Sequence, residues 1–196
     1  MVVAWHRDAA GALQVADTGR AFDREAEFER LVLPLKDRMM RTAWRVARDP
    51  ELAEDAFQEA LVTTWRKLPE LARHPNPPAF VLRICVDAAV DQLRSRRRRQ
   101  GRWAPLEGST ADVGGESPER AAQEGERRDL VLAALARLKG QQATALLLRA
   151  VHEEPYAAIA AALGCSEPTA RVHVLRAREK LRHWLAQLRP VKESRR

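Results

Sequence analysis

Cysteine, glycine and aromatic residues are all scarce in this chain of 196 residues. Its two cysteines, Cys85 and Cys165, are far apart and form no CxxC pair, which argues against a disulfide framework or a zinc site. Nine glycines and few strand-type runs argue against a β-rich protein. No run approaches the ~20 apolar residues that a membrane span needs, and no secretory signal opens the chain. We therefore expect a cytoplasmic protein that contacts no membrane and holds no metal or cofactor.

Alanine, leucine, arginine and glutamate are abundant instead, which favours an all-α protein. The length allows one or two small domains but not a large enzyme with a single core. Lysine and arginine number 34 against 27 acidic residues, which gives a formal net charge of +7. This surplus favours a polyanionic partner, although by itself it does not identify one.

The stretch 154–188 has the pattern of a helix-turn-helix. Gly164 is placed as a left-handed C-cap, and Ser166 as the N-cap of a second helix that Pro168 helps to open. A second helix of this kind lies in the major groove of DNA in many proteins, while the alternative is a helical hairpin with a solvated basic face. The polar face of this helix carries Thr169, Arg171, His173, Arg176 and Arg178.

Three helices with apolar residues at helical spacing are predicted nearer the N-terminus: 24–47, 50–68 and 78–98. Pro34 lies inside the first pattern and should kink or split that helix. The shared apolar faces predict a small bundle over 23–103. Residues 1–22 lack sustained periodicity, so we expect them to be a mobile leader.

Residues 104–124 have the composition of a flexible linker, with three glycines, two prolines and five acidic residues against one arginine. Two further helices, about 118–139 (with Ser117 as its cap) and 141–152, should join the helix-turn-helix in a second bundle over 125–189. A basic tail, 190–196, follows. The expected fold is therefore all-α: two small helical bundles joined by a flexible linker, the second containing a helix-turn-helix.

Two helices of the first bundle carry charges of opposite sign. Acidic residues in first turns favour the helix dipole, yet an acidic face also suits docking of a basic protein. Runs of arginine are often only solvated, but they also bind phosphates regardless of sequence. The acidic residues are Asp49, Glu51, Glu54, Asp55 and Glu59, and the basic ones are Arg83, Arg94 and the run 96–99.

Three motifs, in this order, resemble the extracytoplasmic-function (ECF) type of bacterial RNA polymerase sigma factor. DPELAEDAFQEALVTTWRKL is similar to the helix with which that family binds core polymerase. FVLRICVDAAVDQLRSRRRR resembles the helix that melts and reads the −10 promoter element, and YAAIAAALGCSEPTARVHVLRAREKLR resembles the helix-turn-helix that reads the −35 element. The resemblance covers about 24–100 and 127–183. It implies a protein that is not an enzyme but binds core polymerase and directs promoter-specific transcription initiation.

The resemblance also assigns roles to residues at matching positions. Contact with the coiled coil of the polymerase β′ subunit is implied for Glu54, Asp55, Gln58 and Glu59. Contact with the opened −10 strand is implied for His74, Asn76, Phe80, Arg83, Asp87, Arg94 and Arg97. Contact with the −35 duplex is implied for Thr169, Arg171, His173, Arg176 and Arg178. Core RNA polymerase and promoter DNA are thus the expected partners, and an anti-sigma factor is a further partner that the family admits.

Four positions depart from the family pattern. Phe80 stands where tryptophan is usual and can still stack on a base. Asp87 replaces an asparagine with a carboxylate, which only accepts hydrogen bonds and repels phosphate. His173 removes the permanent charge of a frequent arginine, and Ala170 is smaller than the usual valine. These changes point to a weak or unusual promoter preference.

Two other classes of protein compete with the sigma factor. A sigma-like regulator would bind DNA without supporting initiation, and Asp87 and His173 are the residues that favour it. A helical metalloenzyme would use His152, Glu153 and Glu154, but a zinc-binding helix needs a second histidine four residues on, where Tyr156 stands. We reject the metalloenzyme for this reason.

Overall fold

The computed structural model describes residues 5–7, 13–15, 22–99 and 118–187. Within these ranges the regular secondary structure is helical except for two short antiparallel strands, β1 (Trp5–Arg7) and β2 (Leu13–Val15), in which Trp5 lies opposite Val15. This hairpin falls inside the predicted leader. The rest of the leader, the predicted linker up to residue 117 and the basic tail lie outside the described residues.

The N-terminal bundle follows the predicted order of helices. Helices α2, α3 and α5 pack against one another. Pro34 lies in a 3₁₀ turn and splits the first predicted helix in two, because proline has no N–H to continue the α-helical pattern. The bundle contains α1 (Arg24–Leu31), the 3₁₀ turn η1 (Leu33–Leu35), α2 (Lys36–Ala47), α3 (Pro50–Arg66), α4 (Leu68–Ala72) and α5 (Pro77–Arg99).

Asp49 fixes the start of α3. Its Oδ1 accepts a hydrogen bond from the N–H of Leu52 at 3.0 Å, and its Oδ2 pairs with Arg96 of α5. Burial alone would raise the pKa of Asp49, but the Leu52 N–H and the Arg96 guanidinium hold it below its ordinary value. The Asp49 side chain therefore both caps α3 and joins it to α5. Arg96 of the basic run forms its ion pair inside the protein.

The C-terminal bundle contains the predicted helix-turn-helix. Gly164 adopts the left-handed conformation (φ 65°) that ends the first of its two helices, and the N–H of Cys165 bonds back to Ala160 O at 3.0 Å. Ser166 then caps the second helix through the N–H of Thr169. The bundle consists of α6 (Pro118–Arg137), α7 (Gly140–Val151), α8 (Tyr156–Leu163) and α9 (Glu167–Gln187).

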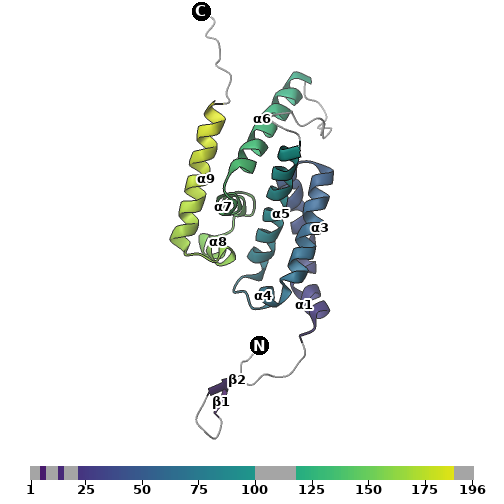
Figure 1. The fold of residues 1–196 in the computed structure, drawn as a ribbon, viewed down its shortest axis with the longest axis vertical. Helices are drawn as coiled ribbons and strands as arrows, with labels where there is room; N and C mark the ends of the chain where they lie inside the picture. The colour runs from purple at the N-terminus through teal and green to yellow at the C-terminus, as the bar shows by residue number, and fades with distance from the viewer. Residues whose placement is uncertain (1–4, 8–12, 16–21, 100–117, 188–196) are drawn as a thin grey trace, which may run out of the picture.

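The two bundles pack directly against each other through α5. Helix α5 contacts α6, α7 and α8, and buried apolar residues of both bundles form one continuous core. As Figure 1 shows, α3 and α9 lie on opposite sides of the molecule, with α5, α6 and α7 between them. The predicted fold class is confirmed, but this packing of one bundle on the other was not predicted. None of the described helices is long and apolar enough to cross a membrane.

Candidate nucleic-acid interface

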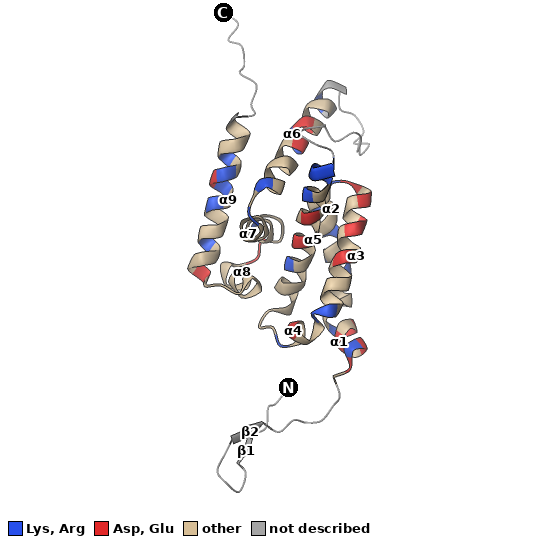
Figure 2. Cartoon of the chain, in the orientation of Figure 1, with Lys and Arg blue, Asp and Glu red and all other residues tan. Residues whose placement is uncertain are grey.

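Helix α9 projects a row of polar and basic side chains away from the second bundle. Ala170, Val174 and Ala177 are buried where α9 packs on α7 and α8, and this turns the opposite face outward. Figure 2 shows the bands of basic residues along the helix. Four of the five predicted −35 residues are exposed there: Thr169, Arg171, Arg176 and Arg178.

The first turn of α9 is held firmly. The guanidinium of Arg171 pairs with Glu167 one turn earlier and lies 4.3 Å from the centroid of the Tyr156 ring on α8. The Thr169 hydroxyl lies 2.8 Å from Ser166 Oγ, the oxygen that caps the helix. Such a preorganised turn suits a helix that docks against a second molecule.

His173 differs from the other predicted −35 residues. Its side chain is half-buried, and Nδ1 is buried without a hydrogen-bond partner. An unpaired buried polar atom costs about 1–3 kcal/mol. Of the two ring nitrogens, at most Nε2 is therefore available to form a hydrogen bond in a DNA groove.

Two apolar residues on the outer face of α9 were missed by the sequence analysis. Val172 and Leu175 are 38% and 56% exposed and lie among the polar side chains of this face. Apolar side chains on such a helix contact thymine methyl groups in the major groove. The sequence contains a signal for their exposure. Once Ala170 and Val174 are assigned to the core, the helical periodicity places Val172 and Leu175 on the outward face.

Helix α3 presents its acidic residues to solvent. Ala53, Ala56 and Phe57 are buried on the opposite face. Gln58 Nε2 donates to Glu54 Oε1 at 3.3 Å, so two of the predicted polymerase contacts are linked on the surface. The exposed acidic row comprises Glu51, Glu54, Asp55 and Glu59, with Gln58 among them.

Apolar side chains extend this acidic row toward the end of α3. Val62 is 46% exposed, and Trp65, although it continues the apolar periodicity of α3, is 38% exposed. The Trp65 ring packs edge-on against Phe28 of α1, and the Arg24 guanidinium lies 5.2 Å from its centroid. The surface of α3 is thus acidic as far as Glu59, and beyond it two apolar side chains, Val62 and Trp65, are exposed.

The loop before α5 is built around His74 and Asn76. Asn76 Oδ1 caps α5 by accepting from the N–H of Ala79 at 3.1 Å, and the N–H of Asn76 donates to His74 Nδ1. Because Nδ1 accepts, Nε2 carries the proton and donates to Ala161 O of α8 at 3.0 Å. The Phe80 ring lies 4.6 Å from the His74 ring and is only 2% exposed, so a base can stack on it only after a rearrangement.

Three arginines of α5 contact the C-terminal bundle. Each donates to a backbone carbonyl of α6 or α8, or of the residue that follows α6. The bonds are Arg83 Nη1 to Ala162 O (2.6 Å), Arg94 Nη2 to Leu138 O (2.7 Å) and Arg97 Nη1 to Ala133 O (2.9 Å).

Asp87 lies at the same contact between the bundles. Its Oδ1 accepts from the hydroxyl of Thr144 on α7, and Arg83 Nε lies 3.5 Å from its Oδ2. Burial raises the pKa of Asp87 above its ordinary value, although Thr144 and Arg83 partly counteract it. All seven predicted −10 residues therefore have a partner inside the protein or, for Phe80, are buried in it.

A groove of about 430 Å³ lies between α3 and α5. Its lining includes Glu59 of the acidic row, Phe80 and Arg83 of the predicted −10 set, and Lys67 and Arg98. The surface expected to meet polymerase and the surface expected to meet DNA thus adjoin each other.

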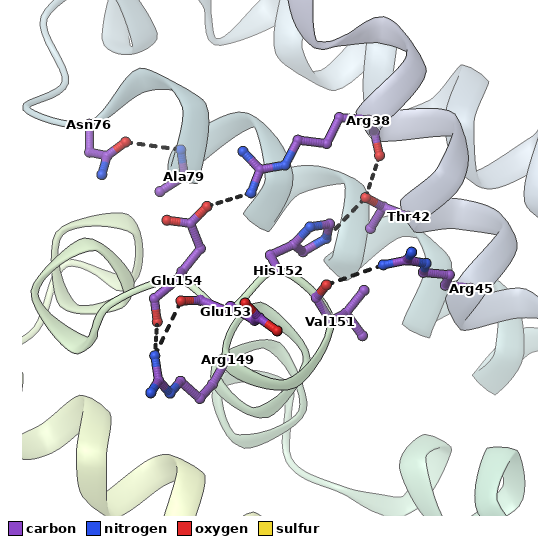
Figure 3. Close-up of polar contacts among 10 residues, drawn as sticks. All are labelled: Arg38, Thr42, Arg45, Asn76, Ala79, Arg149, Val151, His152, Glu153 and Glu154. Carbon is purple, nitrogen blue, oxygen red and sulfur yellow. Dashed lines mark hydrogen bonds and ion pairs between the residues drawn. The ribbon is translucent and has the colours of Figure 1, made fainter.

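A second polar contact joins the bundles along α2 (Figure 3). Arg38 forms an ion pair with Glu154 at 2.8 Å, and Arg45 Nη1 donates to Val151 O at 3.3 Å. Arg149 donates to the carbonyls of Glu153 and Glu154, which holds the connection between α7 and α8 in place.

His152 belongs to the same contact. The hydroxyl of Thr42 donates to Arg38 O at 2.6 Å, so the His152 Nε2–H donates to this hydroxyl at 3.0 Å. Burial, followed by the charges of Arg38 and Arg45, lowers the pKa of His152 to about 4. Within the described part of the chain, no three His, Cys, Asp or Glu side chains gather as metal ligands would.

These features define a class of protein: a DNA-binding protein of two helical bundles, with an exposed acidic face on the first and a helix-turn-helix in the second. Two family models match the chain, sigma-70 region 2 over residues 31–99 and sigma-70 region 4 over residues 128–181. The chain belongs to the sigma-70 family of RNA polymerase sigma factors, and within it to the ECF group. It directs transcription initiation, and proteins of this family are initiation factors rather than catalysts.

Whole-chain comparisons agree with the two family models. The RNA polymerase sigma-E factor of Streptomyces avermitilis is 29% identical over 159 residues, covering 81% of this chain and 85% of the relative. The RNA polymerase sigma-H factor of Pseudomonas aeruginosa is 29% identical over 175 residues, covering 86% and 90%. The sigma factor RpoE of Bartonella quintana, solved in complex with the anti-sigma factor NepR, has a similar fold, with a TM-score of 0.51 at 22% sequence identity. The match covers 82% of this chain and 97% of that chain.

Proposed function

We propose that the N-terminal bundle (23–103) docks on core RNA polymerase and reads the −10 element, while the C-terminal bundle (125–189) reads the −35 element. The linker was predicted over 104–124, but α6 already begins at Pro118, so the part of it that precedes α6 is what lets the two bundles move apart along the promoter. The protein uses no cofactor, does no bond chemistry and acts in the cytoplasm, where core polymerase works. The observation that carries this proposal is the exposed acidic row on α3 in a chain whose net charge is +7.

The acidic row is the proposed contact with the coiled coil of the polymerase β′ subunit. Glu54, Asp55, Gln58 and Glu59 are all exposed on one face of α3. Complementary charge steers association and disfavours wrong partners. The exposed Val62 beyond this row supplies apolar area that a stable contact also needs.

The outer face of α9 is the proposed reader of the −35 duplex. Arg171, Arg176 and Arg178 pair with guanine edges or hold phosphates, and Thr169 contributes a hydroxyl at the start of the helix. His173 takes part through Nε2. Val172 and Leu175, added by the structure, contact thymine methyl groups.

The loop before α5 and the polar side of α5 are the proposed reader of the opened −10 strand. In this role His74, Asn76 and Phe80 hold an unstacked base, while Arg83, Arg94 and Arg97 hold the strand and Asp87 lies among them. An anti-sigma protein is a further proposed partner, which the complex of the Bartonella relative supports.

The docking role of α3 is tested by Asp55→Arg. A like charge placed against a basic partner costs several kcal/mol, so we expect binding to core polymerase to weaken about tenfold or more. The matched control is Glu126→Arg, the same charge change at an exposed position on α6. Binding is measured by titrating labelled chain with core polymerase at fixed salt, and folding of both variants is checked by thermal unfolding.

Equal binding by both variants would place the docking face elsewhere on the molecule.

A second candidate function is a sigma-like regulator that binds duplex DNA without supporting initiation. One observation favours it: every predicted −10 residue is engaged within the protein. That candidate predicts duplex binding without transcripts in the presence of core polymerase.

A further inference from the structure

Tyr156 is the first residue of α8, and its ring lies against one arginine from each of the neighbouring helices. The guanidinium of Arg149, on α7, lies 5.1 Å from the centroid of the ring, and that of Arg171, on α9, lies 4.3 Å from it. A cation within about 6 Å of the centroid of an aromatic ring is attracted by the ring quadrupole. A single ring therefore connects α7 to the helix proposed to read the −35 duplex.

Arg149 is the fixed end of this arrangement. Its Nη1 donates to the carbonyls of Glu153 at 3.2 Å and Glu154 at 3.0 Å, in the connection that leads into α8 (Figure 3). The Tyr156 ring is also partly buried against the apolar core. The position of the ring is therefore set from inside the C-terminal bundle, before any DNA is bound.

Arg171 is the exposed end of the arrangement. Its side chain is 58% exposed, and its Nη2 donates to Glu167 one turn earlier. An exposed ion pair holds a side chain only weakly, because water competes for both charges. The Tyr156 ring adds a second constraint from a different helix, and a ring contact consumes none of the five N–H donors of a guanidinium. Arg171 is thus held in one orientation while most of its donors stay available.

A held arginine suits the reading of a base more than the binding of a phosphate. Guanine is recognised when one guanidinium donates two hydrogen bonds to its O6 and N7 atoms. Both bonds form only when the planar fork faces the edge of the base. A free arginine side chain loses rotational freedom when it adopts this orientation, whereas a preorganised side chain has already lost it.

The place of Arg171 along α9 also suits base reading. In helix-turn-helix proteins the N-terminal residues of the second helix contact base edges in the major groove. Arg171 lies one turn after Glu167, the first residue of α9, and its neighbour Val172 is 38% exposed. Arg176 and Arg178 lie further along the helix.

We infer that Tyr156 is a positioning residue for base reading: its ring, held by Arg149, orients Arg171 toward one guanine of the −35 element. The inference rests on the proposed −35 role of α9. In this role Tyr156 contacts no base itself. Loss of the ring lowers discrimination at one base pair and leaves the phosphate contacts of the protein unchanged.

Tyr156→Leu tests this role, because it removes the ring and leaves an apolar side chain beside the core. Tyr156→Phe keeps the ring and should behave as the wild-type chain does. The matched control is Trp184→Leu: the Trp184 ring also lies against an arginine, Arg137 at 4.6 Å, but it belongs to the second half of α9. All variants are first checked for cooperative thermal unfolding.

Base preference is measured with each variant bound to core polymerase. The holoenzyme is titrated onto duplex fragments of a promoter that was mapped by run-off transcription, with every base pair of the −35 element changed in turn. We expect the wild-type chain, Tyr156→Phe and Trp184→Leu to prefer a G·C pair at one position by about tenfold. Tyr156→Leu should lose that preference, while the salt dependence of its binding stays that of the wild-type chain.

Arg171→Ala completes a double-mutant cycle with Tyr156→Leu. It should abolish the same preference, and Tyr156→Leu should have no further effect on base preference in the Arg171→Ala background. An unchanged preference in Tyr156→Leu would overturn the inference. Equal weakening of Tyr156→Leu on every fragment would also overturn it, because that result indicates a purely structural role. A wild-type holoenzyme without any base preference in the −35 region would instead overturn the proposed role of α9, and the inference with it.

Discussion

Single arginines of α9 differ in how they are held. Arg171 is fixed by Glu167 and by the Tyr156 ring, whereas Arg176 and Arg178 extend from the exposed face one and two turns further along. A fixed guanidinium suits bidentate pairing with a base, because its geometry is set before binding. A side chain that extends freely suits a phosphate, because the phosphate oxygens accept hydrogen bonds from a cation in many directions.

Arg176→Ala tests this division of roles. If Arg176 holds a phosphate, affinity for the −35 duplex should fall and the slope of log affinity against log salt should become shallower by about 0.9. The comparison is Arg127→Ala, which removes the same charge from an exposed position on α6. Binding is measured by fluorescence anisotropy over a range of salt concentrations. An unchanged slope with altered preference at one base pair would assign Arg176 to base reading instead.

At the scale of elements, the contact between α2 and the connection from α7 to α8 contains a titratable side chain, His152. His152 lies between α2 and this connection, with Thr42, Arg38 and Arg45 facing it from α2 and Glu153 and Glu154 following it in the chain. Its pKa is lowered to about 4, so the packed state favours the neutral imidazole. Protonation would place a third positive charge beside two arginines.

Acidification is therefore expected to loosen the contact along α2. For a group whose pKa is lowered in the folded state, the stabilisation is present above its ordinary value of 6.5 and is lost as the pH falls from there through about 4. Small-angle X-ray scattering at pH 7 and pH 5 should show the wild-type chain opening. Asp87 acts in the opposite direction because its pKa is raised, so His152→Gln is the comparison that isolates the histidine. The same pH response in His152→Gln would show that another group controls opening.

Elements with local signals could be predicted from the sequence. The break at Pro34 and the left-handed Gly164 each act within one turn of chain, and each was placed correctly. Trp65 continues the apolar periodicity of α3, yet it lies at the rim against Phe28 and Arg24. The position of Trp65 depends on how α1 packs beside α3, and the apolar periodicity of α3 carries no information about that packing.

Contacts between the bundles could not be predicted in the same way. Arg83, Arg94 and Arg97 bond to backbone carbonyls, which every residue carries and no sequence pattern marks. Asp87 was noticed as unusual, but its partner Thr144 lies far along the chain on α7. The residues proposed to bind DNA were identifiable from the sequence, whereas their engagement inside the protein was visible only in the structure.

At the scale of the whole molecule, three charged surfaces are arranged around one helical core. The acidic row on α3 and the basic row on α9 lie on opposite sides of the molecule (Figures 1 and 2), and Arg83, Arg94 and Arg97 of α5 contact the C-terminal bundle. The proposed contacts with polymerase, with the −35 duplex and with the −10 strand therefore use different surfaces, so each can be disabled separately.

Run-off transcription tests the central claim most directly. Purified chain is mixed with core polymerase and fragmented genomic DNA from the source organism, and the 5′ ends of the transcripts are mapped. The account predicts discrete transcripts that vanish without the chain and with Asp55→Arg but persist with Glu126→Arg, and whose starts share two upstream elements. Binding to core polymerase and to duplex DNA without any transcript would contradict it and identify a sigma-like regulator instead.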